Sequence, residues 1–418
     1  MNKNFLALGL AAALLAPQVA GAEGFAINEW SAEGVAMGGA RMFAEDDAAN
    51  VAYNPASITK VKGEAMKSSS TYLSPHGSYK LYDRTGKEIE NEPTHNKVHA
   101  GWAVGSYYVK QINDKEWFGI GAFPRFAMVS EFERGSNASS NAFFSKLNGV
   151  SVTPTYAHKF DKKWSAAVGA EINYVGLEMQ KNSYDPRVQM NVGATQTEGE
   201  SYALGWNAAA NYAFDDKNEI GVVYRSRITH SLEADFKLYP VTGDKITADA
   251  YGVVTLPDSW DIGYNHKFDK KTRLELKATR TNWSTYDALN ISLSNHSVPN
   301  VLPSDVNSAK NWESGWRYAI GLEHNLSDKY TVMAGFAFDE SSIPSDGGDF
   351  MVPTGLRRTY SIGARYNDKK QTVAVALGWM DVGTLDFAGH PEKGDAYSSA
   401  HAYDSFTKIV SVSYQRKF

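Results

Sequence analysis

The chain has 418 residues, no cysteine and a formal net charge of -5 at pH 7. The lack of cysteine excludes thiolate metal sites, catalytic thiols and disulfides, and the slightly acidic balance gives no basic excess for binding nucleic acid. The mean hydropathy of -0.40 is compatible with a membrane β-barrel, because only every second strand residue of a barrel meets lipid.

The first 22 residues have the features of an export signal. Lys3 precedes an apolar stretch over residues 5 to about 16, and the small residues at 20–22 predict cleavage before Glu23. The apolar stretch is well short of the roughly 20 residues that a spanning helix needs, and no later segment comes closer. We therefore predict a signal peptide over residues 1–22 and no helical membrane span.

Residues 23–62 lack the alternation of a β-strand. They are rich in Ala and Gly, contain the motif Asn54-Pro55-Ala56, and fit two short helices better than strands. The strands that follow predict a barrel whose lumen is too wide for its own side chains to fill. We therefore predict that residues 23–62 form an N-terminal hatch that plugs this lumen.

From residue 63 onward, alternating aromatic-rich segments run into short acidic-basic turns and reverse. Such turns are typical of antiparallel hairpins; they lie at residues 113–115, 161–163, 215–218, 269–271, 327–329 and 367–370. The connections between them are longer and irregular, so one end of the sheet has short turns and the other has long loops. This asymmetry indicates an outer-membrane β-barrel over residues 63–418.

The alternation predicts fourteen strands, and an even number places both termini on the periplasmic side. The predicted strands lie near 64–74, 97–110, 116–130, 148–160, 164–179, 200–214, 219–236, 251–267, 272–290, 313–326, 330–341, 357–366, 371–384 and 404–418. In the strand from Ile220, the alternation predicts an outward set that includes Tyr224 and Ile228. In the strand from Gln371, small residues such as Ala374 and Gly378 are predicted to face the lumen.

The third predicted strand contains Pro124 within the run Phe123-Pro124-Arg125-Phe126. Proline has no N–H to donate to a β-ladder, so we expect a bulge or a break at this point. A bulge that only shapes the barrel is the simpler alternative. A break would open a gap in the barrel wall, through which an apolar molecule could leave sideways without crossing a column of water.

The loop after this strand carries Phe143, Phe144 and Leu147 in a stretch expected to face the outside. Exposed apolar clusters often mark binding surfaces. These three residues are therefore our candidates for a hydrophobic groove that captures ligands. The alternative is a locally packed loop that shields the barrel mouth.

Several cationic side chains are predicted to point into the lumen by alternation: Arg225, Arg227, Arg273, Lys277, Arg317 and Arg365. An arginine can hold a carboxylate through two parallel hydrogen bonds. However, Glu275 and Glu323 are predicted to point inward too, and barrels commonly line their interiors with such ion pairs.

The last strand alternates up to the terminal Phe418, with Tyr414 four residues earlier. This ending resembles the signal that the bacterial outer-membrane assembly machinery reads. Arg416, on the predicted lipid face, departs from the apolar residue that is usual there.

Motifs along the whole mature chain resemble the FadL family of outer-membrane transporters of long-chain fatty acids and other hydrophobic compounds. They occur in that family's order: residues 24–29, 34–40, 45–48, 54–56, 256–258, 281–284, 315–319, 337–339 with Pro344, and Pro353 followed by 358–363. The resemblance implies a monomeric barrel with a hatch, an outer hydrophobic groove, an inner pocket, and lateral exit at a kinked third strand. Arg317 and Arg358, which lie in matched segments, are the head-group candidates it suggests. The family's carboxylate-binding lysine has no matching lysine here.

These observations predict an outer-membrane transporter of a Gram-negative bacterium that takes up long-chain fatty acids or similar compounds. Uptake of aromatic hydrocarbons or other small apolar molecules is the first alternative. A general porin or a surface adhesin or phage receptor is the second, and the hatch argues against a porin. The ten histidines show no spacing typical of a catalytic or metal site, so we expect no enzyme activity, cofactor or metal. The expected partners are the hydrophobic ligand, outer-membrane lipids, lipopolysaccharide and the assembly machinery, with no nucleic acid.

Overall fold

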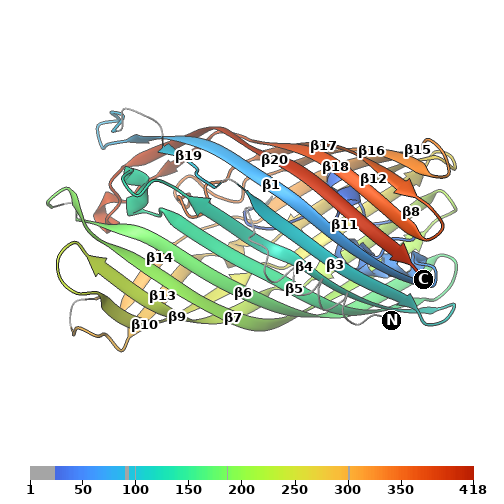
Figure 1. The fold of residues 1–418 in the computed structure, drawn as a ribbon, viewed down its shortest axis with the longest axis horizontal. Coiled ribbons are helices and arrows are strands. Elements are labelled where there is room, and N and C mark those ends of the chain that lie inside the picture. Colours follow the sequence, from blue (N-terminus) through green and yellow to red (C-terminus); the bar gives the residue numbers. More distant parts are fainter. Residues whose placement is uncertain (1–23, 90–93, 99, 186, 300–301) are drawn as a thin grey trace.

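The computed structural model describes residues 24–418 except 90–93, 99, 186 and 300–301. The predicted signal peptide lies outside the described residues. The chain forms a closed antiparallel barrel of fourteen wall strands, as predicted (Figure 1). The barrel closes where the last strand pairs with the first, from Ala65 opposite Lys417 to Tyr82 opposite Ser399.

Some wall strands are continuous and others are broken into two pieces. The first six are β1 (Glu64–Tyr82), β3 (Gly101–Gln111), β4 (Glu116–Glu131), β5 (Phe144–Lys159), β6 (Trp164–Asp185) and β7 (Met190–Ala213). The next four are β8 (Asn218–Arg225) with β9 (Ile228–Pro240), β10 (Ile246–Leu256) with β11 (Ser259–Lys267), β12 (Thr272–Thr281) with β13 (Ala288–Ser294), and β14 (Asp305–Ala309) with β15 (Gly315–Asn325). The last four are β16 (Tyr330–Asp339), β17 (Arg357–Asn367), β18 (Gln371–Val382) and β20 (Ser399–Lys417).

The four broken strands are neighbours, and their breaks lie side by side. Arg225 pairs with Ser259, Ser259 with Thr281, and Thr281 with Gly315. Short pieces complete the loops, namely β2 (Thr94–His95), β19 (Leu385–Ala388) and the 3₁₀-helices η2 (Asn137–Ser140), η3 (Trp283–Thr285) and η4 (Pro391–Lys393). None of the helices in the described part of the chain is long and apolar enough to cross a membrane.

Side chains alternate across the wall, as the sequence predicts for most strands. In β18, Val375 and Leu377 are exposed on the outer face, whereas Ala374 and Ala376 are buried inside. One prediction of this kind is wrong. Ile228, predicted to face outward, is buried in the interior, because the chain loses its alternation at Ser226 and Arg227, between β8 and β9.

Aspartates cap the short turns at one end of the barrel, the right-hand end of Figure 1. The Asp161 carboxylate accepts hydrogen bonds from the backbone N–H groups of Lys163 (2.7 Å) and Trp164 (2.8 Å). These bonds favour the charged form and lower the pKa of Asp161. Asp215, Asp269 and Asp368 cap their turns in the same way. We call this end the turn end and the opposite one the loop end.

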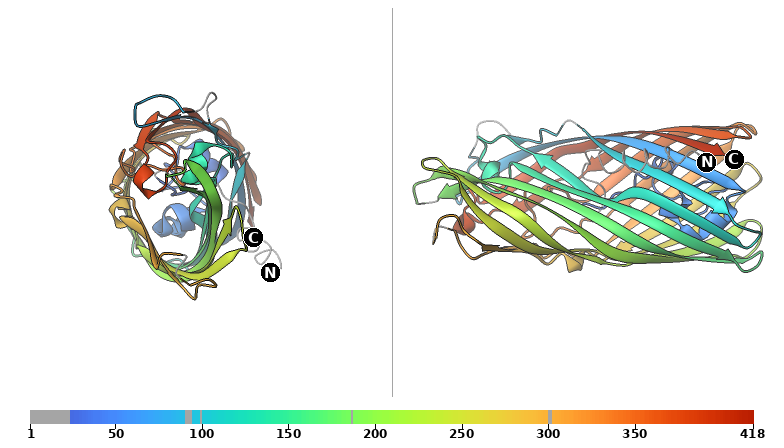
Figure 2. Two further views of the ribbon diagram at one scale, coloured as in Figure 1. Left: turned by 90° about the vertical axis from the view of Figure 1, so that its left-hand side faces the viewer. Right: turned by 60° about the horizontal axis from the view of Figure 1, so that its bottom comes forward.

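Residues 24–62 lie inside the barrel, where they form the predicted plug (Figure 2, left). The plug contains helices α2 (Ala32–Ala36) and α3 (Asn50–Tyr53) and the 3₁₀-helix η1 (Pro55–Lys60). The Tyr53 hydroxyl accepts hydrogen bonds from the N–H groups of Trp30 and Ser31. Gly34 makes this contact possible, because a Cβ there would lie 1.8 Å from the Tyr53 oxygen.

A buried network of charges joins the plug to the wall. Arg41 of the plug contacts Asp47 (3.0 Å) and Glu323 of β15 (3.1 Å), and Lys67 of β1 contacts Glu33 (2.7 Å) and Asp47 (2.9 Å). Burial alone would raise the pKa of Asp47, but Lys67 and Arg41 hold it well below its ordinary value. The network therefore fixes the plug through charges that are all paired, which buried ions require.

Candidate transport site

The wall is incomplete beside the third wall strand, β4. The ladder between β3 and β4 ends at Ser106 opposite Ala122. Beyond it, residues 101–105 of β3 pair with β1, but no described residue of β4 pairs with them. On its other side, β4 keeps its pairing with β5 through a register shift between Pro124 and Phe126. The β3 edge of β4 is therefore free of its neighbour strand from Phe123 onward.

The start of the plug covers this free edge. The N–H of Ile27 donates to the Arg125 carbonyl (2.9 Å), and the N–H of Ala127 donates to the Phe25 carbonyl (2.8 Å). The indole N–H of Trp30 donates to the Pro124 carbonyl (2.6 Å). The edge of β4 is thus satisfied by a segment that is not part of the barrel wall.

Arg125 fixes the bulge from inside the barrel. Its buried guanidinium forms an ion pair with Glu171 of β6 (3.1 Å). It also donates to the carbonyls of Ser226 (3.2 Å) and Pro257 (3.1 Å), which lie at the breaks of two other wall strands. Arg125 therefore links the bulge in β4 to the belt of broken strands across the lumen.

Phe25 fills a cage of aromatic rings next to this edge. Its ring centroid lies 4.7 Å from that of Trp283, 5.6 Å from Tyr286, 5.7 Å from Trp312 and 6.0 Å from Phe126. The same apolar cluster continues along the wall through Leu147, Ile228, Leu232, Val254 and Leu256. A cavity of about 30 Å³ lies beside Phe126 and Ile27. It is far smaller than the roughly 300 Å³ or more of a ligand pocket, and the space among the cage rings is filled by the buried Phe25 ring.

A buried cation lies at the edge of the cage. The ammonium group of Lys310 pairs with the Asp349 carboxylate and lies 3.8 Å from the sulfur of Met351. The backbone N–H of Lys310 donates to the Asp287 carbonyl (2.7 Å), which places the residue beside Tyr286. Of the cage residues, only Phe126 was predicted as a site residue, as part of the strand kink. Lys310 and the other cage rings were not, because they meet only in the folded chain.

The structure separates the two predicted head-group arginines. Arg317 points inward, but it pairs with Asp339 (2.7 Å) and donates to the Gly38 carbonyl of the plug (2.8 Å). Arg358 is exposed on the outer face of β17, near Asp381 (3.5 Å), so it cannot contact a ligand inside the barrel. The inward neighbour is Arg357, which donates to the Gly24 carbonyl (3.1 Å).

The predicted groove residues do not form one exposed surface. Phe143 is buried beneath the Arg134 guanidinium, 4.5 Å from its ring centroid. Phe144 is partly buried, and Leu147 belongs to the interior apolar cluster. The neighbouring Ala142 packs with Phe350, Phe387 and Tyr397 of the other loops. The loop is thus locally packed, which was the alternative interpretation.

The other inward charges and the hatch motif hold the structure together. Arg273 and Arg365 pair with Glu323 (2.9 Å each), Arg225 pairs with Asp261 (2.8 Å), and Lys277 pairs with Asp261 (3.0 Å). Arg227 does not point inward as predicted; it is exposed and pairs with Asp258. In the hatch motif, Asn54 caps η1 at Ala56 and donates to Asn211 of β7 (2.7 Å), while Pro55 begins η1.

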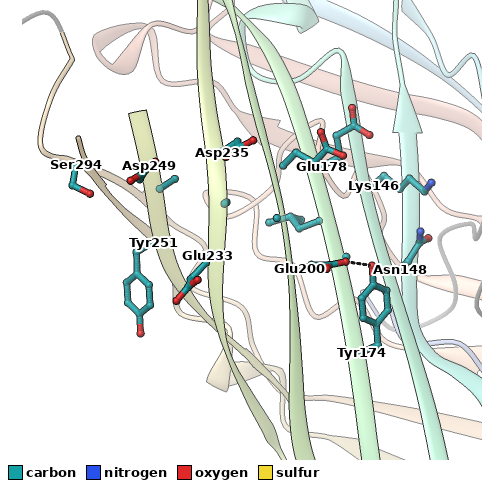
Figure 3. Close-up of a pocket in the computed structure, with 16 residues that line it drawn as sticks. Lys146, Asn148, Tyr174, Glu178, Glu200, Glu233, Asp235, Asp249, Tyr251 and Ser294 are labelled. Carbon is teal, nitrogen blue, oxygen red and sulfur yellow. Dashed lines mark hydrogen bonds between the residues drawn. The ribbon is translucent and has the colours of Figure 1, made fainter. Parts of the chain in front are cut away.

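The outer wall carries a polar hollow near its loop end (Figure 3). It is lined by six carboxylates on neighbouring strands: Glu178, Glu198, Glu200, Glu233, Asp235 and Asp249. The Tyr174 hydroxyl donates to Glu200 (2.9 Å). Among the described residues no group of side chains is arranged to hold a metal ion.

The fold and site define a class of protein, an outer-membrane β-barrel with an internal plug, an apolar interior and an interrupted wall. A family model described as outer membrane protein transport protein (OMPP1/FadL/TodX) matches residues 13–418, and the chain belongs to this family. This family is one of transporters.

Relatives and solved structures agree with the family. The chain is 23% identical to the long-chain fatty acid transport protein of Escherichia coli K12, over 90% of this chain and 91% of that one. It is 24% identical to outer membrane protein P1 of Haemophilus influenzae, over 87% of this chain and 86% of that one. A FadL homologue of Pseudomonas aeruginosa has the same fold, with a TM-score of 0.83 at 18% identity over 94% of this chain and all of the other. The toluene transporter TodX of Pseudomonas putida also has this fold, with a TM-score of 0.70 at 16% identity over 94% of this chain and 99% of that one.

Proposed function

We propose that this protein takes up long-chain fatty acids or similar hydrophobic compounds across the outer membrane. The ligand is captured at the loop end, moves into the aromatic cage, and leaves sideways between β3 and β4. The observation that carries the proposal is the position of residues 25–27, which occupy the cage and cover the free edge of β4 at once. A ligand that displaces Phe25 therefore pulls away the segment that covers the gap.

The energetics favour a long chain as the ligand. Exposing the Phe25 ring costs about 2 to 3 kcal/mol, and burying a methylene contributes about 0.8 kcal/mol. Three or four buried methylenes offset the displacement, so a long acyl chain has a large surplus. Lys310 at the edge of the cage supplies a cation for a carboxylate.

Uptake of aromatic hydrocarbons is the second candidate. It is supported by the cage itself, whose rings offer edge-to-face contacts to an aromatic ligand, and by the likeness to toluene transporters. A general porin has less support, because the plug fills the lumen. We further propose that the protein acts as a monomer among outer-membrane lipids and lipopolysaccharide. The side chain of Phe418, exposed on the outer wall, is available to the assembly machinery.

The two candidate functions predict different responses to removal of the buried ion pair. In a strain without its own transporter, uptake of labelled oleate and of toluene is measured with the wild-type chain and with Lys310→Met/Asp349→Leu. Because both charges are removed together, no buried charge is left unpaired. Oleate uptake should fall at least ten-fold and toluene uptake should change less than two-fold.

A matched control is Lys270→Met at an exposed turn, which should change neither rate. Equal loss of both compounds would indicate damage to the loops. Unchanged oleate uptake would remove Lys310 from the proposed route, and toluene uptake without oleate uptake in the wild type would establish the second candidate.

A further inference from the structure

The wall has another interruption, between β7 and β9. The ladder from β7 to the next wall strand ends at Asn207 opposite Arg225 and resumes only at Glu200 opposite Glu233. Residues 201–206 of β7 thus have no ladder partner on the described part of that strand. A β-bulge displaces one residue, so it does not explain an interruption of this length.

Two adjacent changes of direction cause the interruption. Ser226 turns toward β7, where its hydroxyl accepts from the Trp206 N–H and its own N–H donates to the Trp206 carbonyl, both at 2.9 Å. Arg225 is held inward by Asp261, and Arg227 is held outward by Asp258. The chain therefore leaves the plane of the ladder here, and Ile228 points inward.

An aromatic row lies beside the interruption on the outer wall. Trp206, Tyr224 and Trp260 form a row on the outer wall, with ring centroids 5.0 Å and 4.6 Å apart. Such aromatic rows mark the membrane interface in barrels. Just beyond them on β7, Tyr202 is 71% exposed and Leu204 is 76% exposed, the highest value among the exposed large apolar residues.

The apolar interior lies directly behind the interruption. Ile228 and Leu232 belong to the same buried cluster as Phe25 and Trp283. The Ile228 side chain lies against Gly205, where a Cβ would be 2.8 Å from Ile228 Cγ1. Ile228 therefore lies between this apolar cluster and the β7 segment that has no ladder partner.

A polar group is held beside this side chain. His230 is fully buried, and its Nε2 lies 2.9 Å from the Asn173 side-chain oxygen. Its Nδ1 contacts no hydrogen-bonding partner among the described residues. The Asn173 oxygen can only accept, so Nε2 carries the hydrogen and Nδ1 is an acceptor. A buried acceptor without a partner is costly, and a ligand with one hydroxyl group would satisfy it.

We propose that the interruption between β7 and β9 is a second lateral opening, which passes uncharged hydrophobic molecules that carry one hydroxyl group. The proposal rests on the proposed function, because it gives the same apolar interior a second route. Its rim on the loop side is formed by Glu200 and Glu233, which are paired across β7 and β9 and both line the polar hollow of Figure 3. Their negative charges disfavour a carboxylate, so fatty acids keep the opening at β4.

A removable cross-link tests the opening, since the chain has no cysteine of its own. Continuing the upper register places Leu204 opposite Thr229, and Leu204→Cys/Thr229→Cys would close the wall by a disulfide. The control is Ala210→Cys/Val222→Cys, a pair already joined by the ladder. The probes are labelled hexadecanol and hexadecanoate, which have equal chain lengths.

Oxidation of the Leu204/Thr229 variant should lower hexadecanol uptake at least five-fold and change hexadecanoate uptake less than two-fold. Reduction of the disulfide should restore hexadecanol uptake. Oxidation of the control pair should change the uptake of neither probe. Hexadecanol uptake that the cross-link leaves unchanged would overturn the proposal. Loss of both probes to the same extent would also overturn it.

A second measurement does not depend on transport. Ile228→Cys and Val223→Cys are each exposed to a maleimide carried on a lipid acyl chain in the membrane; both residues are buried and point inward, but Val223 lies in an intact ladder. Ile228→Cys should react at least ten-fold faster, and equal rates would refute the opening. If the reduced Leu204→Cys/Thr229→Cys protein takes up neither hexadecanol nor hexadecanoate, that result counts against the proposed function. The maleimide labelling would still show whether the wall is open between β7 and β9.

Discussion

Replacing Phe25 with Ala tests whether the ligand must displace the plug from the cage. The Phe25 ring contributes about 2 to 3 kcal/mol by burial, and a ligand that takes its place loses that amount of its own binding free energy. Phe25→Ala removes the competitor and leaves an apolar cavity of matching shape. The affinity for a long-chain fatty acid should therefore rise by roughly 30-fold to 150-fold, at about 1.4 kcal/mol per tenfold.

Purified protein in detergent serves for the assay, in which unlabelled oleate displaces a fluorescent fatty acid. The control is Phe160→Ala, because Phe160 is 57% exposed on the outer wall and its loss should leave the affinity unchanged. Heat-modifiable migration on a gel should be retained by both variants, since neither residue belongs to a ladder. An affinity that falls in Phe25→Ala would mean that the ligand binds against the ring, and the displacement argument would be wrong.

Three further predictions follow from the plug, the wall and the ion network. Deleting residues 24–62 should leave a folded barrel with much higher ion conductance in planar bilayers, because a wide lumen loses its plug; conductance equal to that of the intact chain would contradict the plugging role. Replacing Phe123-Pro124-Arg125 with a regular alternating sequence should restore the pairing of β4 with β3. Oleate uptake should then fall severely, while surface display of the protein stays normal. A substitution in the hatch is the comparison, and oleate uptake that survives a verified closure of the wall would favour an axial route through the lumen. The pKa of Asp47 is lower in the folded protein than in the unfolded chain, where it is about 3.9. The ionised Asp47 therefore stabilises the folded state at any pH above about 3.9. This stability is lost as the pH falls through the lower pKa of the folded state. Conductance should therefore stay low from pH 7 to about pH 4 and rise in stronger acid, whereas Asp47→Asn should conduct at pH 7; an increase in the wild type near pH 6 would contradict this assignment.

The barrel could be predicted from sequence because its signals are local. Alternation and turn chemistry act over a few residues, and they place the wall strands and the aspartate caps. The effect of Pro124 was predictable for the same reason, since the missing N–H is a property of one residue. The breaks near Ser226 and Pro257 were not predicted, although Pro257 carries the same local signal as Pro124. Their hydrogen bonds to Arg125 from across the lumen could not be predicted from local patterns.

The site could be predicted only in part, because its contacts join distant positions. Phe25, Phe126, Trp283 and Trp312 meet through folding alone, and their spacing in the chain carries no signal. Arg358 was chosen from a motif, but alternation gives the inward direction to its neighbour Arg357. Phe143 is buried because other loops pack over it, which no local pattern indicates.

The seam between β1 and β20 determines when the molecule can be completed. It joins the first wall strand to the last one, from Ala65 opposite Lys417 to Tyr82 opposite Ser399. Contacts of such high sequence separation form late, and this one needs the last strand of the chain to have been exported. The plug precedes the first strand, so the growing sheet must curl around it before the seam closes. Assembly therefore encloses the plug, and the charges between Arg41 and Glu323 leave water only when the final hairpin arrives.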